Sequence, residues 1–356
     1  MRYAVFTSSA NGLILADKIR NNMSAVVDIY CHENMPPRED VQSYSRLSTL
    51  LKDIFNKYSG LIFIMATGIV VRTIAPLLES KLTDPAVVVM DEKGQNIISL
   101  LSGHVGGAND LTLKLARKLG GNPVITTATD INYLVAPDVV ASKLGLYPVS
   151  KEGIQVLNSA LLRGETVEYF VDEETPCSRS YITKLRKNAI TAHLYSKAEL
   201  ERVIKTTKGY KAIITKHSLP ADESVLYLKP RKLVAGIGCR KGTSSVLIMK
   251  ALTSACGAIG WGLERVDELA SSVVKANEQG LLSVGKKLNK QVSFCENDAL
   301  EKQIEAYGLQ ESSFVKQTIG VGNVSEAAAY CCVAHGVLAL PKTKYEKVAV
   351  ALVWEK

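Results

Sequence analysis

The sequence predicts a multi-domain α/β protein built from mostly parallel open sheets with flanking helices. Its 356 residues exceed what one small core needs. Short β-rich runs alternate with helical patterns along its first third, as in sheets whose parallel strands are joined by helices. A composition of 47% hydrophobic and 22% charged residues is typical of a chain that folds throughout. We therefore expect two outer α/β domains, 1–136 and 230–356, joined by a smaller middle α/β segment, 137–229.

The first domain is expected to alternate strands and helices. Short apolar, β-branched runs indicate buried strands, and apolar residues three to four apart indicate helices. A turn at 92–95 separates two of the strands. The expected strands are 3–9, 25–31, 60–66, 85–91, 96–101 and 122–128, and the expected helices are 12–22, 47–58, 67–80 and 106–120.

The other two segments carry fewer signals, and in the middle segment no glycine-rich turn with polar residues follows a strand. The middle segment is expected to hold helices 151–164 and 197–207 and strands 166–172 and 210–217. The third is expected to begin with strand 232–239, to continue with helices 244–255, 265–279 and 324–336, and to end in a hairpin around 341–347.

The net charge of +8 favours an acidic partner, which could be nucleic acid, an anionic membrane surface or a small polyanion. Aromatic residues are only 6% and the lysines are scattered, so the stacking platforms and basic stripes of nucleic-acid binders are missing. The sequence has neither a signal-peptide pattern at its start nor an apolar run of membrane-span length. Seven cysteines without CxxC spacing indicate reduced thiols. We expect a cytoplasmic protein that binds neither nucleic acid nor membrane.

The first turn with a chemical signal is MATGIVVRTIAP, where a strand leads into a helix at Thr67 and Gly68. Thr67 is suited to cap the helix, and Arg72 follows about one helical turn later. A guanidinium in that place could hold a carboxylate with two hydrogen bonds. A simpler interpretation is that Thr67 is a plain cap and Arg72 a surface charge.

The second turn is SGHVGGAND, where three glycines surround a histidine. Gly103, Gly106 and Gly107 are expected to leave backbone N–H groups bare at the positive end of a helix, as an oxyanion site requires. If the segment is extended, Ser102 and His104 share a face. We predict that His104 is a general base for water, and that Ser102 either orients it or acts as nucleophile. The absence of GxSxG counts against the nucleophile, and a purely structural histidine stays open.

The third turn is PVITTATDIN, in which Thr127 and Asp130 follow an apolar strand. Asn109 and Asp110, in the second turn, could bond a ligand or stabilise the start of their helix. In open α/β sheets, ligands bind at the carboxyl ends of the strands. Because each of the three turns follows a strand, we expect them to converge on one substrate site.

The last domain contains AGIGCRKGTSS, which matches neither GxGxxG nor a P-loop. What remains is a strand, a glycine turn and a helix cap, which together predict an anion-binding nest. Cys239, between glycine and two cations, could have a lowered pKa, although an inert turn cysteine is the commoner case. No metal-ligand spacing is present. The candidate binding residues here are Gly238, Cys239, Arg240, Lys241 and Thr243.

Four stretches of the first domain resemble, in this order, the amino-terminal domain of the cobalt-precorrin-5A hydrolases of anaerobic cobalamin biosynthesis: FIMATGIVVRTIAPLL, DPAVVVMDEKG, ISLLSGHVGGAND and PVITTATD. VAGIGCRKGTSS, FCENDAL and VLALPKTKYEKVAVAL resemble the carboxyl-terminal domain of that family. The resemblance implies an enzyme that opens the ring A acetate δ-lactone of cobalt-precorrin-5A and releases the C20 fragment as acetaldehyde, giving cobalt-precorrin-5B.

This reaction fits the predicted site: water activated by His104 would attack the lactone carbonyl, and amides near Gly106 and Gly107 would hold the oxyanion. The resemblance does not identify the base, so His104 is an inference from chemistry. Because the cobalt arrives with the substrate, we expect no cofactor and no metal site in the protein. The substrate's acetate and propionate arms would meet cationic clamps, for which the candidates are Arg72, Lys81, Arg240 and Lys241.

The expected partner is cobalt-precorrin-5A. Transient contacts with other cobalamin-pathway enzymes and a homodimer are compatible with the sequence. Two other classes stay open: a non-catalytic tetrapyrrole carrier of the same pathway, and a nucleotide-dependent enzyme, which the broken nucleotide motifs disfavour. Acetaldehyde release separates the enzyme from the carrier.

Overall fold

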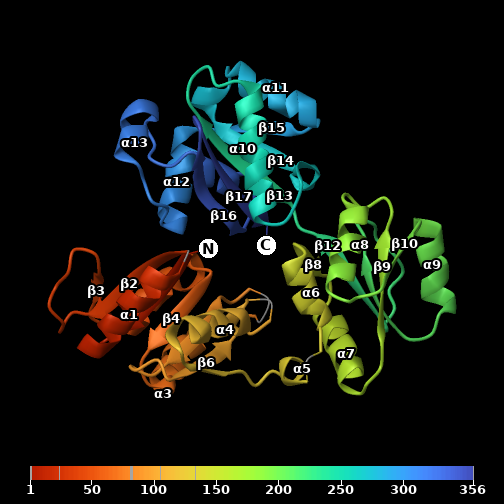
Figure 1. Cartoon of the computed structure of the whole chain (residues 1–356), viewed down its shortest axis with the longest axis horizontal. Helices are drawn as coiled ribbons and strands as arrows, with labels where there is room; N and C mark the ends of the chain where they lie inside the picture. Colours follow the sequence, from red (N-terminus) through yellow and green to blue (C-terminus); the bar gives the residue numbers. More distant parts are fainter. Residues whose placement is uncertain (1, 24, 81–82, 105, 133, 356) are drawn as a thin grey trace. The chain divides into compact units, whose positions relative to one another are not determined.

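The computed structural model describes residues 2–23, 25–80, 83–104, 106–132 and 134–355 (Figure 1). The chain forms two compact units, Met1–Val135 and Ala136–Lys356. Their sheets are mostly parallel and carry flanking helices, which confirms the predicted α/β class. The division into three domains stays a prediction. Among the described residues, every helix is too short or too polar to cross a membrane.

The first unit contains a seven-stranded sheet of order β3-β2-β1-β4-β5-β6-β7. Its strands are β1 (Arg2–Thr7), β2 (Val26–His32), β3 (Gln42–Tyr44), β4 (Gly60–Ile64), β5 (Ala86–Met90), β6 (Asn96–Leu101) and β7 (Asn122–Val124). Its helices are α1 (Ala10–Asn22), α2 (Leu47–Ile54), α3 (Thr67–Ile74), α4 (Ala108–Leu119) and α5 (Ala128–Ile131). β3 and α5 were not predicted from the sequence, because both are only three or four residues long.

Both faces of this sheet are buried, since successive residues of a strand point to opposite faces. On β1, Val5 belongs to the apolar cluster that contains residues of α1 and α4, whereas Phe6 belongs to the cluster that contains residues of α2 and α3. The strands therefore read as continuous apolar runs, as parallel strands covered on both sides do.

The last two strands run against the other five. β5 pairs with β6 in the antiparallel direction, and β7 is parallel to β6. The Asp91 side chain accepts hydrogen bonds from the amides of Lys93, Gln95 and Asn96, and Gly94 has a φ of +66°, so the chain reverses within a tight hairpin. The carboxyl ends of β6 and β7 consequently lie at the sheet edge opposite to those of β1 and β4.

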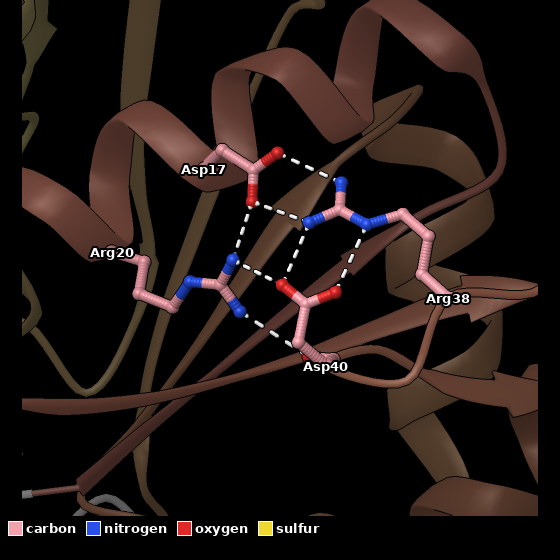
Figure 2. A network of polar contacts seen from close by, with 4 residues as sticks. All are labelled: Asp17, Arg20, Arg38 and Asp40. Carbon is pink, nitrogen blue, oxygen red and sulfur yellow. Dashed lines mark hydrogen bonds and ion pairs between the residues drawn. The ribbon is translucent and has the colours of Figure 1, made fainter.

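A ring of four charged side chains ties α1 to the segment after β2 (Figure 2). Arg38 makes two-pronged ion pairs with Asp17 and Asp40, with Nη–Oδ distances down to 2.7 Å. Arg20 Nη2 lies 2.7 Å from Asp17 Oδ1 and 2.6 Å from Asp40 Oδ2. Each carboxylate meets both guanidiniums, and Arg38 and Arg20 together hold the pKa of Asp40 well below its usual range.

The second unit contains two five-stranded sheets, of order β10-β9-β11-β12-β8 and β15-β14-β13-β17-β16. The first comprises β8 (Leu146–Pro148), β9 (Val167–Asp172), β10 (Ala192–Tyr195), β11 (Tyr210–Ile214) and β12 (Val225–Pro230), with α6 (Pro137–Lys143), α7 (Lys151–Leu162), α8 (Ser178–Lys187) and α9 (Lys197–Thr206). The second comprises β13 (Leu233–Cys239), β14 (Glu268–Ser272), β15 (Gln291–Cys295), β16 (Gly336–Tyr345) and β17 (Val348–Glu355), with α10 (Ser245–Ala258), α11 (Gln279–Leu288), α12 (Asn297–Tyr307), α13 (Ser313–Ile319) and α14 (Ser325–Cys331).

One predicted helix of this unit is wrong. Residues 265–279 contain β14, which pairs in parallel with both β13 and β15. Leu269, Ala270 and Ser271 are fully buried in the sheet. A short buried apolar run does not distinguish helix from strand by its periodicity, and here its position in the middle of a sheet decides. The antiparallel pair β16–β17 forms the hairpin expected around 341–347.

Candidate functional site

The carboxyl ends of β6 and β7 bring the second and third predicted turns together. His104 Nε2 lies 2.8 Å from Asp130 Oδ2 and 3.1 Å from Thr129 Oγ1. Asp130 belongs to the short helix α5, which begins four residues after β7. The His104 side chain is 12% exposed and that of Asp130 37%, so the pair can meet solvent or a ligand while most of the imidazole is covered.

Asn109, in the first turn of α4, joins these groups to the sheet. Its Oδ1 accepts a hydrogen bond from Ser99 Oγ on β6 at 2.6 Å. Its Nδ2 donates to Thr127 Oγ1 at 3.1 Å and to Asp130 Oδ2 at 2.9 Å. Asn109 is 5% exposed, and its side chain bonds these groups rather than the backbone at the start of its own helix. Ser99 was not among the predicted site residues, because only its contact with Asn109 reveals its role.

The amides of this turn are less available than expected. The Gly107 N–H donates to His104 O, the Ala108 N–H to Ser102 O and the Asn109 N–H to Gly103 O, at 3.0 to 3.1 Å. The chain bends back on itself, and its own carbonyls satisfy the first amides of α4. The prediction of a bare amide is therefore wrong for Gly107, although open space borders its Cα.

Ser102 does not lie on an extended segment with His104, as we expected. β6 ends at Leu101, and Ser102 has a φ of +57°, in the left-handed region. Its Oγ is buried and has no hydrogen-bond partner among the described residues. A Cβ on Gly106 would lie 2.4 Å from that of Ser102, so Gly106 must be glycine for this fold of the turn. A buried hydroxyl is a poor nucleophile for a substrate that arrives from solvent.

The first predicted turn lies elsewhere. Thr67, Gly68 and Arg72 follow β4, whose carboxyl end is opposite Met90, whereas β6 ends opposite Val87. Three residue steps along β5, from Val87 to Met90, at ~3.3 Å each separate the two ends by roughly 10 Å. The expected convergence of all three turns is therefore wrong: the second and third meet, and the first does not join them.

The other predicted site residues of this unit make few contacts that would define a binding site at either end of the strands. Arg72 is exposed and its guanidinium lies over Gly68, 3.4 Å from where a Cβ would be. Asp110 is an exposed acidic residue in the first turn of α4, a place that suits a carboxylate. Lys81 lies outside the described residues.

The turn after β13, in the second unit, is bonded internally. The Gly242 N–H donates to Glu278 Oε2 at 2.9 Å, and Lys275 Nζ lies 3.3 Å from the other oxygen of that carboxylate. Thr243 Oγ1 donates to Arg240 O at 2.7 Å. Burial raises the pKa of the Cys239 thiol, which Lys275 opposes only in part, so the lowered pKa that we considered is wrong.

The side chains of Arg240 and Lys241 are exposed and can meet an anion, while Gly238 is partly exposed. Within the part of the chain that the structure describes, no group of three or more His, Cys, Asp and Glu could hold a metal ion.

Comparison with known proteins places this chain among cobalamin-synthesis proteins. Residues 49–130 match the family described as Cobalamin synthesis G N-terminal, and residues 233–353 match Cobalamin synthesis G C-terminus. The cobalt-precorrin-5A hydrolase of Salmonella typhimurium is 34% identical, with 92% of this chain and 90% of the relative covered. The cobalt-precorrin-5A hydrolase of Priestia megaterium is 30% identical, with 88% of this chain and 83% of the relative covered.

A solved structure, described as a cobalamin biosynthesis protein G homologue from Sulfolobus solfataricus, has a similar fold. The TM-score is 0.59 at 20% identity, and the superposition covers 99% of this chain and 97% of the other.

Proposed function

The chain belongs to the cobalt-precorrin-5A hydrolase family, and on that premise we propose that it is an enzyme of cobalamin biosynthesis that hydrolyses cobalt-precorrin-5A. The products are cobalt-precorrin-5B and acetaldehyde. The observation that carries the catalytic part of the proposal is the hydrogen bond between His104 and Asp130, beside a glycine-rich turn at the end of β6. A partly exposed imidazole paired with a carboxylate is suited to move protons near neutral pH.

The reaction needs one base that can take up and return a proton. His104 removes a proton from water as the water oxygen bonds to the lactone carbonyl carbon. When the lactone C–O bond breaks, the proton returns to the departing oxygen on C20. Removal of that hydroxyl proton then lets the oxygen form a carbonyl as the bond between C20 and the ring breaks, with its electron pair passing into the macrocycle. The sum consumes one water and needs neither an oxidant nor a reductant.

The cobalt is part of the substrate, so we propose that the reaction requires no added metal, cofactor or nucleotide. The acetate and propionate arms of the substrate are carboxylates, which agree in sign with the net charge of +8. Arg240 and Lys241 are exposed at the end of β13 and are the candidate clamps of the second unit. We also propose a cytoplasmic location, which the seven free cysteines support.

The test is anaerobic incubation of the whole protein with cobalt-precorrin-5A and assay of acetaldehyde. We expect one acetaldehyde per substrate without nucleotide or metal, and a single-turnover rate in His104→Gln that is lower by ~10²-fold or more at normal substrate binding. His217→Gln is a matched control, because His217 Nε2 also bonds a carboxylate, Glu174 Oε2 at 3.0 Å, but in the other unit.

The outcomes separate the alternatives. Substrate binding without acetaldehyde from the wild type would make the protein a carrier. A wild-type rate in folded His104→Gln would remove His104 from the chemistry while leaving the enzyme.

A further inference from the structure

We propose that Asp130 is a positioning residue for His104: it fixes the tautomer of the imidazole and stabilises the imidazolium that forms when His104 accepts a proton, while Asn109 holds Asp130 in place. The inference rests on the proposed function, since it assigns roles within that reaction. It replaces the expectation that Asp130 and Asn109 bind substrate, because the structure has both side chains bonded to other groups of the site.

The contacts of Nε2 determine where the ring carries its hydrogen. The Asp130 carboxylate accepts a hydrogen bond from Asn109 at the same oxygen, Oδ2, that faces His104. An ionised carboxylate can only accept, so His104 Nε2 donates its single hydrogen to Asp130 at 2.8 Å, and the Thr129 hydroxyl, 3.1 Å from the same nitrogen, does not donate to it. In the neutral imidazole the lone pair then sits on Nδ1.

The orientation of the Asn109 amide follows from its three neighbours. Ser99 Oγ lies 2.6 Å from Oδ1, and the hydroxyl hydrogen satisfies this oxygen. The two hydrogens of Nδ2 then meet Thr127 Oγ1 and Asp130 Oδ2. The flipped amide would place its oxygen against the Asp130 carboxylate, which repels it. A residue of β6 thereby fixes, through Asn109, a carboxylate on α5.

The pair gains in strength from its surroundings. The His104 side chain is 12% exposed, so water screens its interaction with Asp130 less than it would on the surface. When His104 takes a proton from water, the two side chains form an ion pair, and the charge on the ring is matched without any movement. Loss of the carboxylate would leave the imidazolium unmatched and allow the ring to turn, as in other sites where a neighbouring carboxylate orients a histidine.

The test compares Asp130→Asn with Asn109→Leu, which removes the amide at a similar side-chain volume. For Asp130→Asn we expect a single-turnover rate lower by roughly 10²-fold with little change in substrate affinity. The acidic limb of the rate–pH profile should move to lower pH, because the carboxylate that favours the protonated ring is gone. Asp130→Glu should recover part of the rate. Asn109→Leu should lower the rate by roughly tenfold.

Matched controls exclude a change of charge or fold as the cause. Glu174→Gln removes a carboxylate that bonds His217 in the other unit and should leave rate and profile unchanged. Two further acidic residues beside this turn remain in every variant: Asp84, whose carbonyl oxygen lies 3.2 Å from where a Cβ on Gly106 would be, and Asp110 in the first turn of α4. A purely structural role of Asp130 would lower the thermal midpoint and leave the pH limb in place.

A second readout does not depend on turnover. In protein labelled with ¹⁵N-histidine, long-range ¹⁵N–¹H correlation spectra should show the His104 ring protonated at Nε2 in the wild type and a mixture of tautomers in Asp130→Asn, with the signal assigned from His104→Gln. An unchanged tautomer together with an unchanged pH limb would overturn the inference. Absence of acetaldehyde from the wild type would instead overturn the proposed function, whatever the tautomer.

Discussion

Thr67 and Ser102 each follow closely after a strand of the same sheet, yet they lie at opposite edges of it. Thr67 follows β4, which is parallel to β5, and Ser102 follows β6, which is antiparallel to β5. The 2.8 Å contact between His104 and Asp130 is on the Ser102 edge, and Arg72 is on the other. Proton transfer and carboxylate binding can therefore be tested by separate substitutions in the first unit.

Arg72→Ala should weaken the binding of a corrinoid analogue by about tenfold and leave the single-turnover rate at saturating substrate unchanged. The side chain can pair with a carboxylate arm, and a charge-assisted hydrogen bond contributes ~1.5 kcal/mol or more. Its distance from His104 keeps it out of the chemical step. Titration with the analogue measures the affinity, and rapid-quench acetaldehyde assays measure the single-turnover rate. Unchanged affinity would show that the substrate does not reach this edge.

The reversal of β6 could have been predicted from the sequence. Only four residues, 92–95, separate the expected strands 85–91 and 96–101, whereas a parallel connection needs a dozen or more. Gly94 and the side chain of Asp91, which both favour a tight turn, add to that signal. The predicted convergence of three turns failed because β6 runs antiparallel to β5, so its carboxyl end does not lie beside that of β4.

Other features depend on tertiary structure that no local pattern encodes. The strand at 268–272 is distinguished from a helix only by its neighbours β13 and β15. The amide of Gly107 looks available in the sequence until the fold brings the carbonyl of His104 to it. The α/β class and most strands of the first unit follow from apolar patterning, which is local. The contact between Asp130 and His104, which are 26 residues apart in the sequence, cannot be predicted from a local pattern.

Ser102→Ala should keep a single-turnover rate within about threefold of the wild type. The hydroxyl is buried and has no hydrogen-bond partner among the described residues, so its removal costs no interaction that the structure shows. Acetaldehyde assays on the folded variant measure the rate. If Ser102 were the nucleophile, the variant would be as inactive as His104→Gln, and an acyl adduct would be detectable on the wild type by mass spectrometry.

Gly106→Ala and Gly107→Ala should differ although the residues are neighbours. A Cβ on Gly106 would lie 2.4 Å from Ser102 Cβ and 2.9 Å from Ser102 O, which forces the turn apart and costs about 1–3 kcal/mol. A Cβ on Gly107 meets nothing within 4 Å, and only its φ of +84° is strained, at about 1 kcal/mol. Urea unfolding midpoints rank the two. Activity should fall in Gly106→Ala, because the same turn carries His104; equal effects would contradict the close contact.

The charged ring of Figure 2 should make stability depend on pH in acid. Because Arg38 and Arg20 lower the pKa of Asp40, the carboxylate contributes stability that is fully present above the pKa of an unfolded aspartate, about 4. This stability is lost as the pH falls through the lower folded value. Thermal midpoints from pH 7 down to pH 2 should fall less steeply in Arg38→Ala than in the wild type. The difference should shrink in high salt, which screens exposed pairs; identical slopes would show that the ring contributes nothing.

Arg240→Ala and Cys239→Ala should separate binding from reactivity at the end of β13. Arg240 is exposed, and its loss should weaken binding of the corrinoid analogue by about tenfold, as expected for one carboxylate clamp. Partial burial raises the pKa of the Cys239 thiol, and the amide of Gly242 already bonds Glu278, so the thiol should react slowly with iodoacetamide at neutral pH. Cys239→Ala should therefore bind and turn over as the wild type does. Rapid alkylation of Cys239, blocked by the analogue, would instead place an activated thiolate at a binding site there.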